Sequence, residues 1–273
     1  MRRSLLGLLG AFLALSSIQG PTAQAQDGGD APVLYRIANE GKLRVGMSGN
    51  QPPLNVKSKS GELIGLEVDL AQLLARAMGV ELVPVMKPFG DLLGALEKGE
   101  VDLVMSGMTM TPARNMRAAF VGPYFVSGKS ILTKAENLAN RDETDEINAS
   151  GVTLAALEGS TSQRFVEMLI PKAKLETTKD YDTAVQLVID GKVDAFVADH
   201  PICVLSVLRF PEANLATLAT PLTVEPIGIA LPPQDPLFVN LIQNYLGALQ
   251  GTGEFDALRA KWLEDGSWVS QLP

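Results

Sequence analysis

Residues 91–107, with the sequence DLLGALEKGEVDLVMSG, carry the most information about the fold of this chain. The spacing of their apolar residues predicts a helix over 89–98 that Gly99 ends, and the apolar run 101–105 predicts a buried strand. Residues 182–199, DTAVQLVIDGKVDAFVAD, repeat the same order of helix, glycine, Val-Asp pair and strand. Two such units predict two α/β lobes, with a cleft where the polar ends of their strands meet.

The rest of the chain keeps this alternation. Further helices are expected at 34–40, 67–78, 161–169, 181–190, 236–250 and 254–263, and further strands at 43–47, 80–85, 152–157, 174–177 and 195–198. Such a pattern indicates mainly parallel sheets covered by helices. One lobe should comprise 26–131 plus 225–273 and the other 132–224, because the chain becomes extended again over 215–231. Two extended crossings, near 130–133 and 224–229, should join them.

The N-terminus and the composition limit the class of protein. Residues 1–25 have the build of a cleavable signal peptide, with a charged start, an apolar stretch over 5–18 and a small-residue cleavage site at 23–25. We therefore expect an exported, periplasmic and monomeric protein without stable membrane insertion. The net charge of −8 argues against nucleic acid as a partner. A single histidine and a single cysteine provide no zinc cluster and no internal disulfide, so neither metal nor cofactor is expected.

Residues 105–114, MSGMTMTPAR, hold the candidate binding groups. Ser106, the Gly107 backbone and Thr109 can donate hydrogen bonds where a strand ends. Arg114 adds a forked guanidinium, the group best matched to a carboxylate. The alternative is an ordinary strand-to-helix turn, in which Thr111 caps a short helix and Arg114 is only solvated.

Seven segments in the same order resemble the periplasmic solute-binding proteins of the polar amino-acid type, the receptors of ATP-driven importers known as family 3. These segments are 43–54, 61–79, 106–114, 122–128, 157–161, 193–201 and 221–231. The resemblance implies the type II fold of periplasmic binding proteins, in which two lobes, each a mixed, mainly parallel sheet flanked by helices, are joined by two hinge strands. It also implies capture of a small amino acid and its delivery to the membrane permease of an ABC importer.

The resemblance also assigns roles to residues. Arg114 would bind the ligand's α-carboxylate, Thr161 would close on that group from the other lobe, and Asp199 would pair with the α-ammonium. The other residues implied in the pocket are Gln51, Phe89, Ser106, Gly107, Met108, Thr109 and Ser160. Opposite charges are needed at both ends because a zwitterion that leaves water loses hydration at each.

Several alternatives remain open for these residues. Asp199 could instead cap a helix before Pro201, and Phe89 could be an ordinary core aromatic. Ser48 stands where receptors for basic ligands place an acid, and Gln51 stands where many relatives carry an aromatic residue. With Leu157 also apolar, the pocket shows no spare charge, and a neutral amino acid is the expected ligand.

Two other functions are compatible with this scaffold. One is an exported enzyme similar to the cyclohexadienyl and arogenate dehydratases, which act on prephenate or arogenate and need a general acid in the cleft. Glu158 is the nearest candidate for that acid. The other is a ligand-sensing domain. The expected function remains that of a receptor rather than an enzyme.

Overall fold

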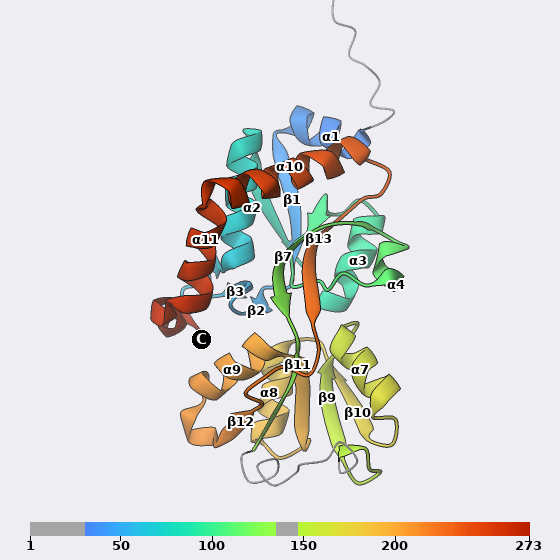
Figure 1. The fold of residues 1–273 in the computed structure, drawn as a ribbon, viewed down its shortest axis with the longest axis vertical. Coiled ribbons are helices and arrows are strands. Elements are labelled where there is room, and N and C mark those ends of the chain that lie inside the picture. The colour runs from blue at the N-terminus through green and yellow to red at the C-terminus, as the bar shows by residue number, and fades with distance from the viewer. Residues whose placement is uncertain (1–30, 135–146) are drawn as a thin grey trace, which may run out of the picture.

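The computed structural model describes residues 31–134 and 147–273, which form two lobes joined by a narrow connection (Figure 1). Each lobe contains a five-stranded sheet with helices against it. The predicted two-lobed α/β fold is confirmed. The expected signal peptide and most of the polar segment 134–150 lie outside the described residues. In the part of the chain that is described, no helix is long and apolar enough to cross a membrane.

The first lobe is built on the sheet with strand order β5-β1-β6-β13-β7. Strand β1 pairs in parallel with β5 and with the central strand β6, whereas β13 runs antiparallel to β6 and β7. The strands are β1 (Lys42–Met47), β5 (Glu81–Met86), β6 (Leu103–Val104), β7 (Ala119–Ser127) and β13 (Glu225–Leu231), with a small separate sheet of β2 (Asn50–Gln51), β3 (Asn55–Lys57) and β4 (Leu63–Ile64).

The helices of the first lobe bury apolar stripes against this sheet. In α2 the buried residues include Leu66, Leu70 and Leu74, and Gly79 ends the helix in the left-handed conformation at φ +69°. The helical elements are α1 (Pro32–Glu40), α2 (Leu66–Met78), α3 (Phe89–Glu97), α4 (Pro112–Asn115), α10 (Pro236–Thr252), α11 (Glu254–Arg259), the π-helical turn η2 (Ala260–Glu264) and the 3₁₀ segment η3 (Gly266–Gln271).

The second lobe is built on the sheet with strand order β10-β9-β11-β8-β12. Strands β10, β9 and β11 are parallel, and β8 runs antiparallel to β11 and β12. The elements are β8 (Lys129–Lys134), β9 (Thr153–Leu157), α7 (Thr161–Leu169), β10 (Lys174–Thr178), α8 (Tyr181–Ile189), β11 (Ala195–Asp199), α9 (His200–Arg209), η1 (Pro211–Ala213) and β12 (Leu215–Thr217).

Two crossings connect the lobes, and they are hydrogen-bonded to each other. The chain leaves the first sheet at Ser127, enters the second at Lys129 and returns to the first at Glu225. The Lys129 backbone N–H donates to Thr223 Oγ1 at 2.9 Å, and its carbonyl accepts from the Leu222 N–H at 2.7 Å. The division of the chain at 131/132 and 224/225 stays a prediction.

Local differences from the sequence-based expectations have simple causes. Helix α9 was implied only by the alternative in which Asp199 caps a helix before Pro201; Pro201 opens its first turn, and its inner face buries Ile202 and Cys203. The strand expected over 101–105 is shorter and spans only Leu103–Val104, and the chain after it continues beside β13 through the isolated bridge between Thr109 and Ile227. The extended run expected over 215–231 is two strands, β12 and β13, in different sheets.

Candidate functional site

Arg114 lies in α4, at the edge of the first lobe that faces α7 of the second. Thr111 caps α4 as the alternative reading proposed, since its Oγ1 accepts from the Arg114 N–H at 3.2 Å. The guanidinium is nevertheless held in place. Its Nη1 donates to the Thr109 carbonyl at 2.9 Å, and its Nη2 donates to the Gly159 carbonyl of the other lobe at 3.2 Å. These bonds use two of the five guanidinium N–H groups.

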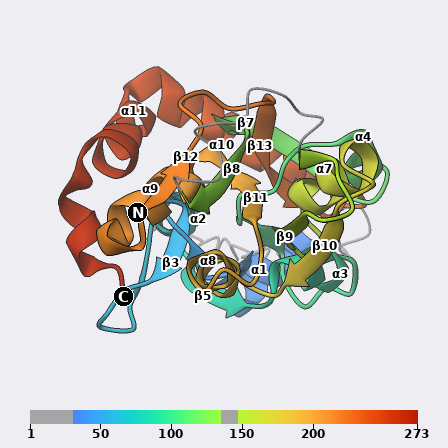
Figure 2. The same cartoon turned by 90° about the horizontal axis from the view of Figure 1, so that it is seen from below.

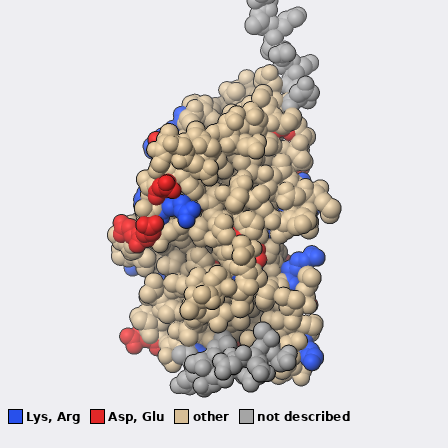
Figure 3. Space-filling view, viewed as in Figure 1, with Lys and Arg blue, Asp and Glu red and all other residues tan. Residues whose placement is uncertain are grey.

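Phe89, at the start of α3, is buried and forms a wall for this arginine. The Arg114 guanidinium carbon lies 5.5 Å from the centre of the Phe89 ring, a cation–π distance. A cavity of about 630 Å³ opens beside them, and its lining includes Met108, Ser160 and Thr161. Figure 3 shows the hollow between the lobes on this side, with basic side chains at its border.

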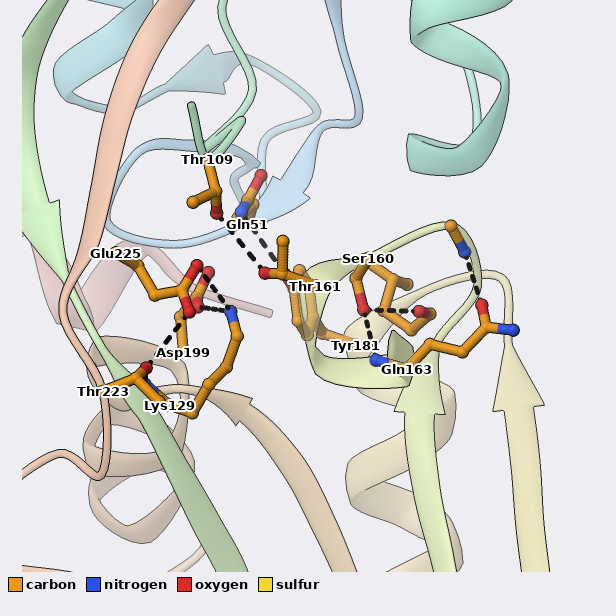
Figure 4. A network of polar contacts seen from close by, with 12 residues as sticks. Gln51, Thr109, Lys129, Ser160, Thr161, Gln163, Tyr181, Asp199, Thr223 and Glu225 are labelled. Carbon is orange, nitrogen blue, oxygen red and sulfur yellow. Dashed lines mark hydrogen bonds and ion pairs between the residues drawn. The ribbon is translucent and has the colours of Figure 1, made fainter. Parts of the chain in front are cut away.

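The two lobes touch deeper in the cleft, so the structure is a closed form. Thr109 Oγ1 of the first lobe lies 3.4 Å from Thr161 Oγ1 of the second. Gln51 Nε2 donates to Tyr181 Oη at 3.3 Å across the same interface (Figure 4). Seen from below, α7 and α4 lie on one side of this interface and α9 on the other (Figure 2).

Ser106 and Gly107 are buried rather than open to the cleft. Ser106 Oγ accepts from the Ser48 N–H at 3.0 Å and lies 3.3 Å from Gln51 Oε1. The Gly107 N–H donates to Glu67 Oε1 at 2.6 Å, so its partner is a side chain and not an open ligand position. Gly107 has a φ of +57°, and a Cβ there would lie 2.1 Å from Gln51 Nε2.

Glu67 was not predicted as a site residue, although its spacing in the helix places it among buried residues. It lies on the buried side of α2, four and seven residues before the fully buried Ala71 and Leu74. Its carboxylate accepts from Gly107, Asn55 and Tyr124. Burial raises the pKa of Glu67 above its ordinary value, and these three hydrogen bonds oppose that shift. Glu67 thereby positions the loop that follows β6.

Asp199 ends β11 and is nearly buried, close to the crossings between the lobes. It occupies the N-cap position of α9 but makes no side-chain capping bond, which speaks against the capping alternative. Instead its Oδ1 accepts from Lys129 Nζ at 2.6 Å, and the same Nζ lies 3.7 Å from Glu225 Oε2. Neither Lys129 nor Glu225 was singled out in the sequence, because nothing local marks them.

The charges of the two lobes interact through this interface. Burial lowers the pKa of Arg114, and the negative charges of Asp199 and then Glu225 oppose the shift. Burial, followed by the Asp199 charge, raises the pKa of Tyr181 well above its ordinary value. Arg114 and Asp199 thus place opposite charges on the two lobes that meet here.

The expected site residues are divided between two cavities in this closed form. Phe89, Met108, Arg114, Ser160 and Thr161 line the larger cavity described above. Gln51 and Asp199 line a smaller one of about 10 Å³, whereas Ser106, Gly107 and Thr109 line neither of these two. That all ten share one ligand remains a prediction.

Glu158 and Cys203, two side chains with chemistry that an enzyme could use, are both poorly placed for catalysis. Glu158, the expected candidate for a general acid, forms an ion pair with Lys179, and its side chain is 46% exposed. Among the described residues, no group of His, Cys, Asp and Glu is placed to hold a metal ion. Cys203 is buried beneath β12, and burial raises its pKa to about 12, so it is unreactive at neutral pH.

Comparison with proteins of known sequence finds similarity over nearly the whole chain. The cyclohexadienyl dehydratase of Pseudomonas aeruginosa is 28% identical over 264 residues, covering 97% of this chain and 97% of that protein. The L-cystine-binding protein TcyJ of Escherichia coli is 24% identical, covering 96% of this chain and 95% of that protein.

Solved structures show the same resemblance. A putative binding component of an ABC transporter from Wolinella succinogenes, complexed with lysine, is 35% identical with a TM-score of 0.79, covering 84% of this chain and 99% of that chain. The ancestral amino acid-binding protein AncCDT-1, described as a precursor of cyclohexadienyl dehydratase, is 33% identical with a TM-score of 0.77, covering 84% of this chain and 98% of that chain.

A family model matches residues 43–265, which is most of the chain. It describes the bacterial extracellular solute-binding proteins, family 3, as the seven segments implied. Together with the two-lobed fold and the cleft between the lobes, this match shows that the chain belongs to the bacterial extracellular solute-binding proteins of family 3.

Proposed function

We propose that this protein is a periplasmic, monomeric receptor that encloses one neutral amino acid between its lobes and delivers it to an ABC permease. The observation that carries the proposal is the placement of a guanidinium and a carboxylate on opposite lobes. Arg114 belongs to the first lobe, Asp199 belongs to the second, and the lobes meet between them. A zwitterion satisfies both charges only when the lobes close around it.

Binding would proceed through the groups already in contact in the closed form. Arg114 presents a planar donor to the ligand's carboxylate. The hydroxyls of Thr109 and Thr161, now 3.4 Å apart, supply further donors from either lobe and separate to admit the ligand. Asp199 Oδ2 is the atom that we assign to the α-ammonium. Each lobe alone offers one half of the site, so closure is coupled to binding.

We expect a ligand of zero net charge because the charged residues of the site balance one another. Arg114 and Lys129 contribute two positive charges, and Asp199 and Glu225 contribute two negative ones. A ligand of zero net charge leaves this balance unchanged, whereas a basic or an acidic amino acid adds one unpaired buried charge. The lysine bound to the Wolinella protein makes a basic ligand the main competitor.

The second candidate function is a dehydratase, which the similarity to the Pseudomonas enzyme favours. Two contacts argue for binding without turnover. Glu158 is engaged with Lys179 at the surface, and Asp199 is engaged with the buried Lys129. Each of these carboxylates is thus paired with a lysine ammonium rather than directed at the place where a leaving group would need a proton.

A thermal-shift screen of the protein against the twenty amino acids, prephenate and arogenate tests the proposal. A true ligand at a hundred times its Kd stabilises the folded state by about 2.7 kcal/mol. The expected result is a shift with one or a few neutral amino acids, which mass spectrometry recovers unchanged. Conversion of prephenate or arogenate would replace the receptor by the enzyme, and no shift with any amino acid would refute the proposal.

A further inference from the structure

Lys129 is the most deeply buried charged group at the junction of the lobes. Its side chain is only 2% exposed, and its Nζ lies 2.6 Å from Asp199 Oδ1 and 3.7 Å from Glu225 Oε2. Figure 4 shows the lysine side chain beside the two carboxylates, with its ammonium directed at both and with Thr109 and Thr161 above it. Burying an ammonium costs free energy unless opposite charges surround it, and here two carboxylates do so.

These three residues come from distant parts of the chain and meet at the hinge. Lys129 begins β8 directly after the first crossing, Glu225 begins β13 at the second crossing, and Asp199 ends β11. Thr223 supports the cluster, because its Oγ1 accepts from the Lys129 N–H and donates to Glu225 Oε1 at 3.1 Å. The cluster carries two negative charges and one positive charge, so a single negative charge remains for a ligand.

We propose that Lys129 is a specificity-determining residue that restricts this site to amino acids of zero net charge. The inference rests on the proposed receptor function. The lysine ammonium occupies the position in which two adjacent carboxylates would otherwise hold a second cationic group of the ligand. A basic amino acid brings both an α-ammonium and a side-chain cation, and with Lys129 in place only one of them finds an unpaired negative charge.

Charge-changing variants at this cluster should move the specificity in opposite directions. Lys129→Met removes the ammonium that pairs with the two carboxylates, so the site gains a negative charge and should prefer L-lysine or L-arginine. Glu225→Gln keeps the Lys129–Asp199 pair and removes one negative charge, so it should prefer L-glutamate or L-aspartate. The double variant Lys129→Met/Glu225→Gln restores the balance and should again prefer a neutral amino acid. Lys192→Met is the matched control, because Lys192 pairs with Asp190 but its side chain is 64% exposed.

Isothermal titration of each variant with L-lysine, L-arginine, L-glutamate and the preferred neutral ligand measures the effect. In each single variant we compare the affinity for the neutral ligand with the affinity for the charged ligand that the variant should prefer. The ratio of the first to the second should fall by about thirtyfold or more, because a buried charge left unpaired has an effect of this size. The control should keep the wild-type order. If Lys129→Met does not fold, Glu225→Gln and the double variant decide the matter, because each retains at most one unpaired charge in the cluster.

The outcomes separate this inference from the proposed function. Wild-type protein that binds no amino acid refutes the proposed function. Wild-type protein that binds a neutral amino acid, with the same order of ligands in every folded variant, overturns the role of Lys129 and leaves the receptor function intact. Wild-type protein that prefers L-lysine or L-arginine overturns the inference together with the neutral ligand of the proposed function, and leaves an amino-acid receptor standing.

Discussion

Replacement of Arg114 by alanine removes the group on which the proposed site depends. The change deletes the donors to the Thr109 and Gly159 carbonyls and the cation above the Phe89 ring. It also leaves the ligand's carboxylate without an opposite charge in a closed cleft. Loss of one partner of a hydrogen-bonded, desolvated charge pair costs about 2–5 kcal/mol, which corresponds to about 30- to 5,000-fold in Kd. Arg114→Lys should lose less, because it keeps the charge but not the planar fork.

Isothermal titration with the best ligand of the screen measures this loss, and circular dichroism checks that the fold is retained. Arg117→Ala is the matched control. Arg117 borders the same cavity, but its guanidinium pairs with Glu97 and its side chain is 51% exposed, so its removal should leave affinity nearly unchanged. Wild-type affinity in a folded Arg114→Ala variant would remove this residue from the site and refute the reasoning about the zwitterion.

Three further variants test other contacts. Asp199→Asn should weaken binding less than Asp199→Ala, because the amide oxygen still accepts from the ligand and from Lys129; equal losses in titration would contradict this. Gly90→Val should reduce affinity without loss of thermal stability, since a Cβ at this helical position lies 3.3 Å from the Glu158 carbonyl of the other lobe; unchanged affinity would show that closure tolerates the bulk. Glu67→Gln should cost about 1–3 kcal/mol in urea unfolding, because its amide faces the Asn55 donor. Burial raises the pKa of Glu67 above 4.5, so between pH 4.5 and the raised pKa the native state binds a proton that the unfolded chain has released. The contribution of Glu67 to the free energy of unfolding is therefore full below pH 4.5 and falls as the pH rises through the raised pKa. The stability difference between wild type and Glu67→Gln should therefore shrink with rising pH, and a difference that grows would contradict the assignment.

Much of the local structure follows from the sequence because its causes are local. The helix periods near 67–78 and 181–190, and the glycine after the first of them, predict α2 and α8 to within a few residues. Thr111 and Pro112 predict the start of α4, because capping involves groups three residues apart. The repeat of helix, glycine and strand predicts two lobes, since each unit must bury one apolar face against a sheet.

The sequence misjudged elements whose stability comes from tertiary contacts. Residues 200–209 show a weak apolar period, and helix α9 forms because β8 and β12 cover its inner face. The Gly107 N–H was expected to face a ligand, but the fold brings Glu67 to it from forty residues away. No pattern within the 105–114 segment indicates that this donor is already taken.

The sequence by itself indicated the two α/β lobes, because periodicity and caps act over a few residues, and seven short segments in order indicated the family and, through it, opposite charges at Arg114 and Asp199. Only the tertiary structure decided how those charges are balanced. Lys129 and Asp199 are 70 residues apart, and they meet because β8 and β11 pair antiparallel with Lys129 opposite Asp199. Glu225 joins them because the second crossing runs beside the first. Strand register and the course of the two crossings set these distances, and neither can be predicted from the residues that lie nearby in the sequence.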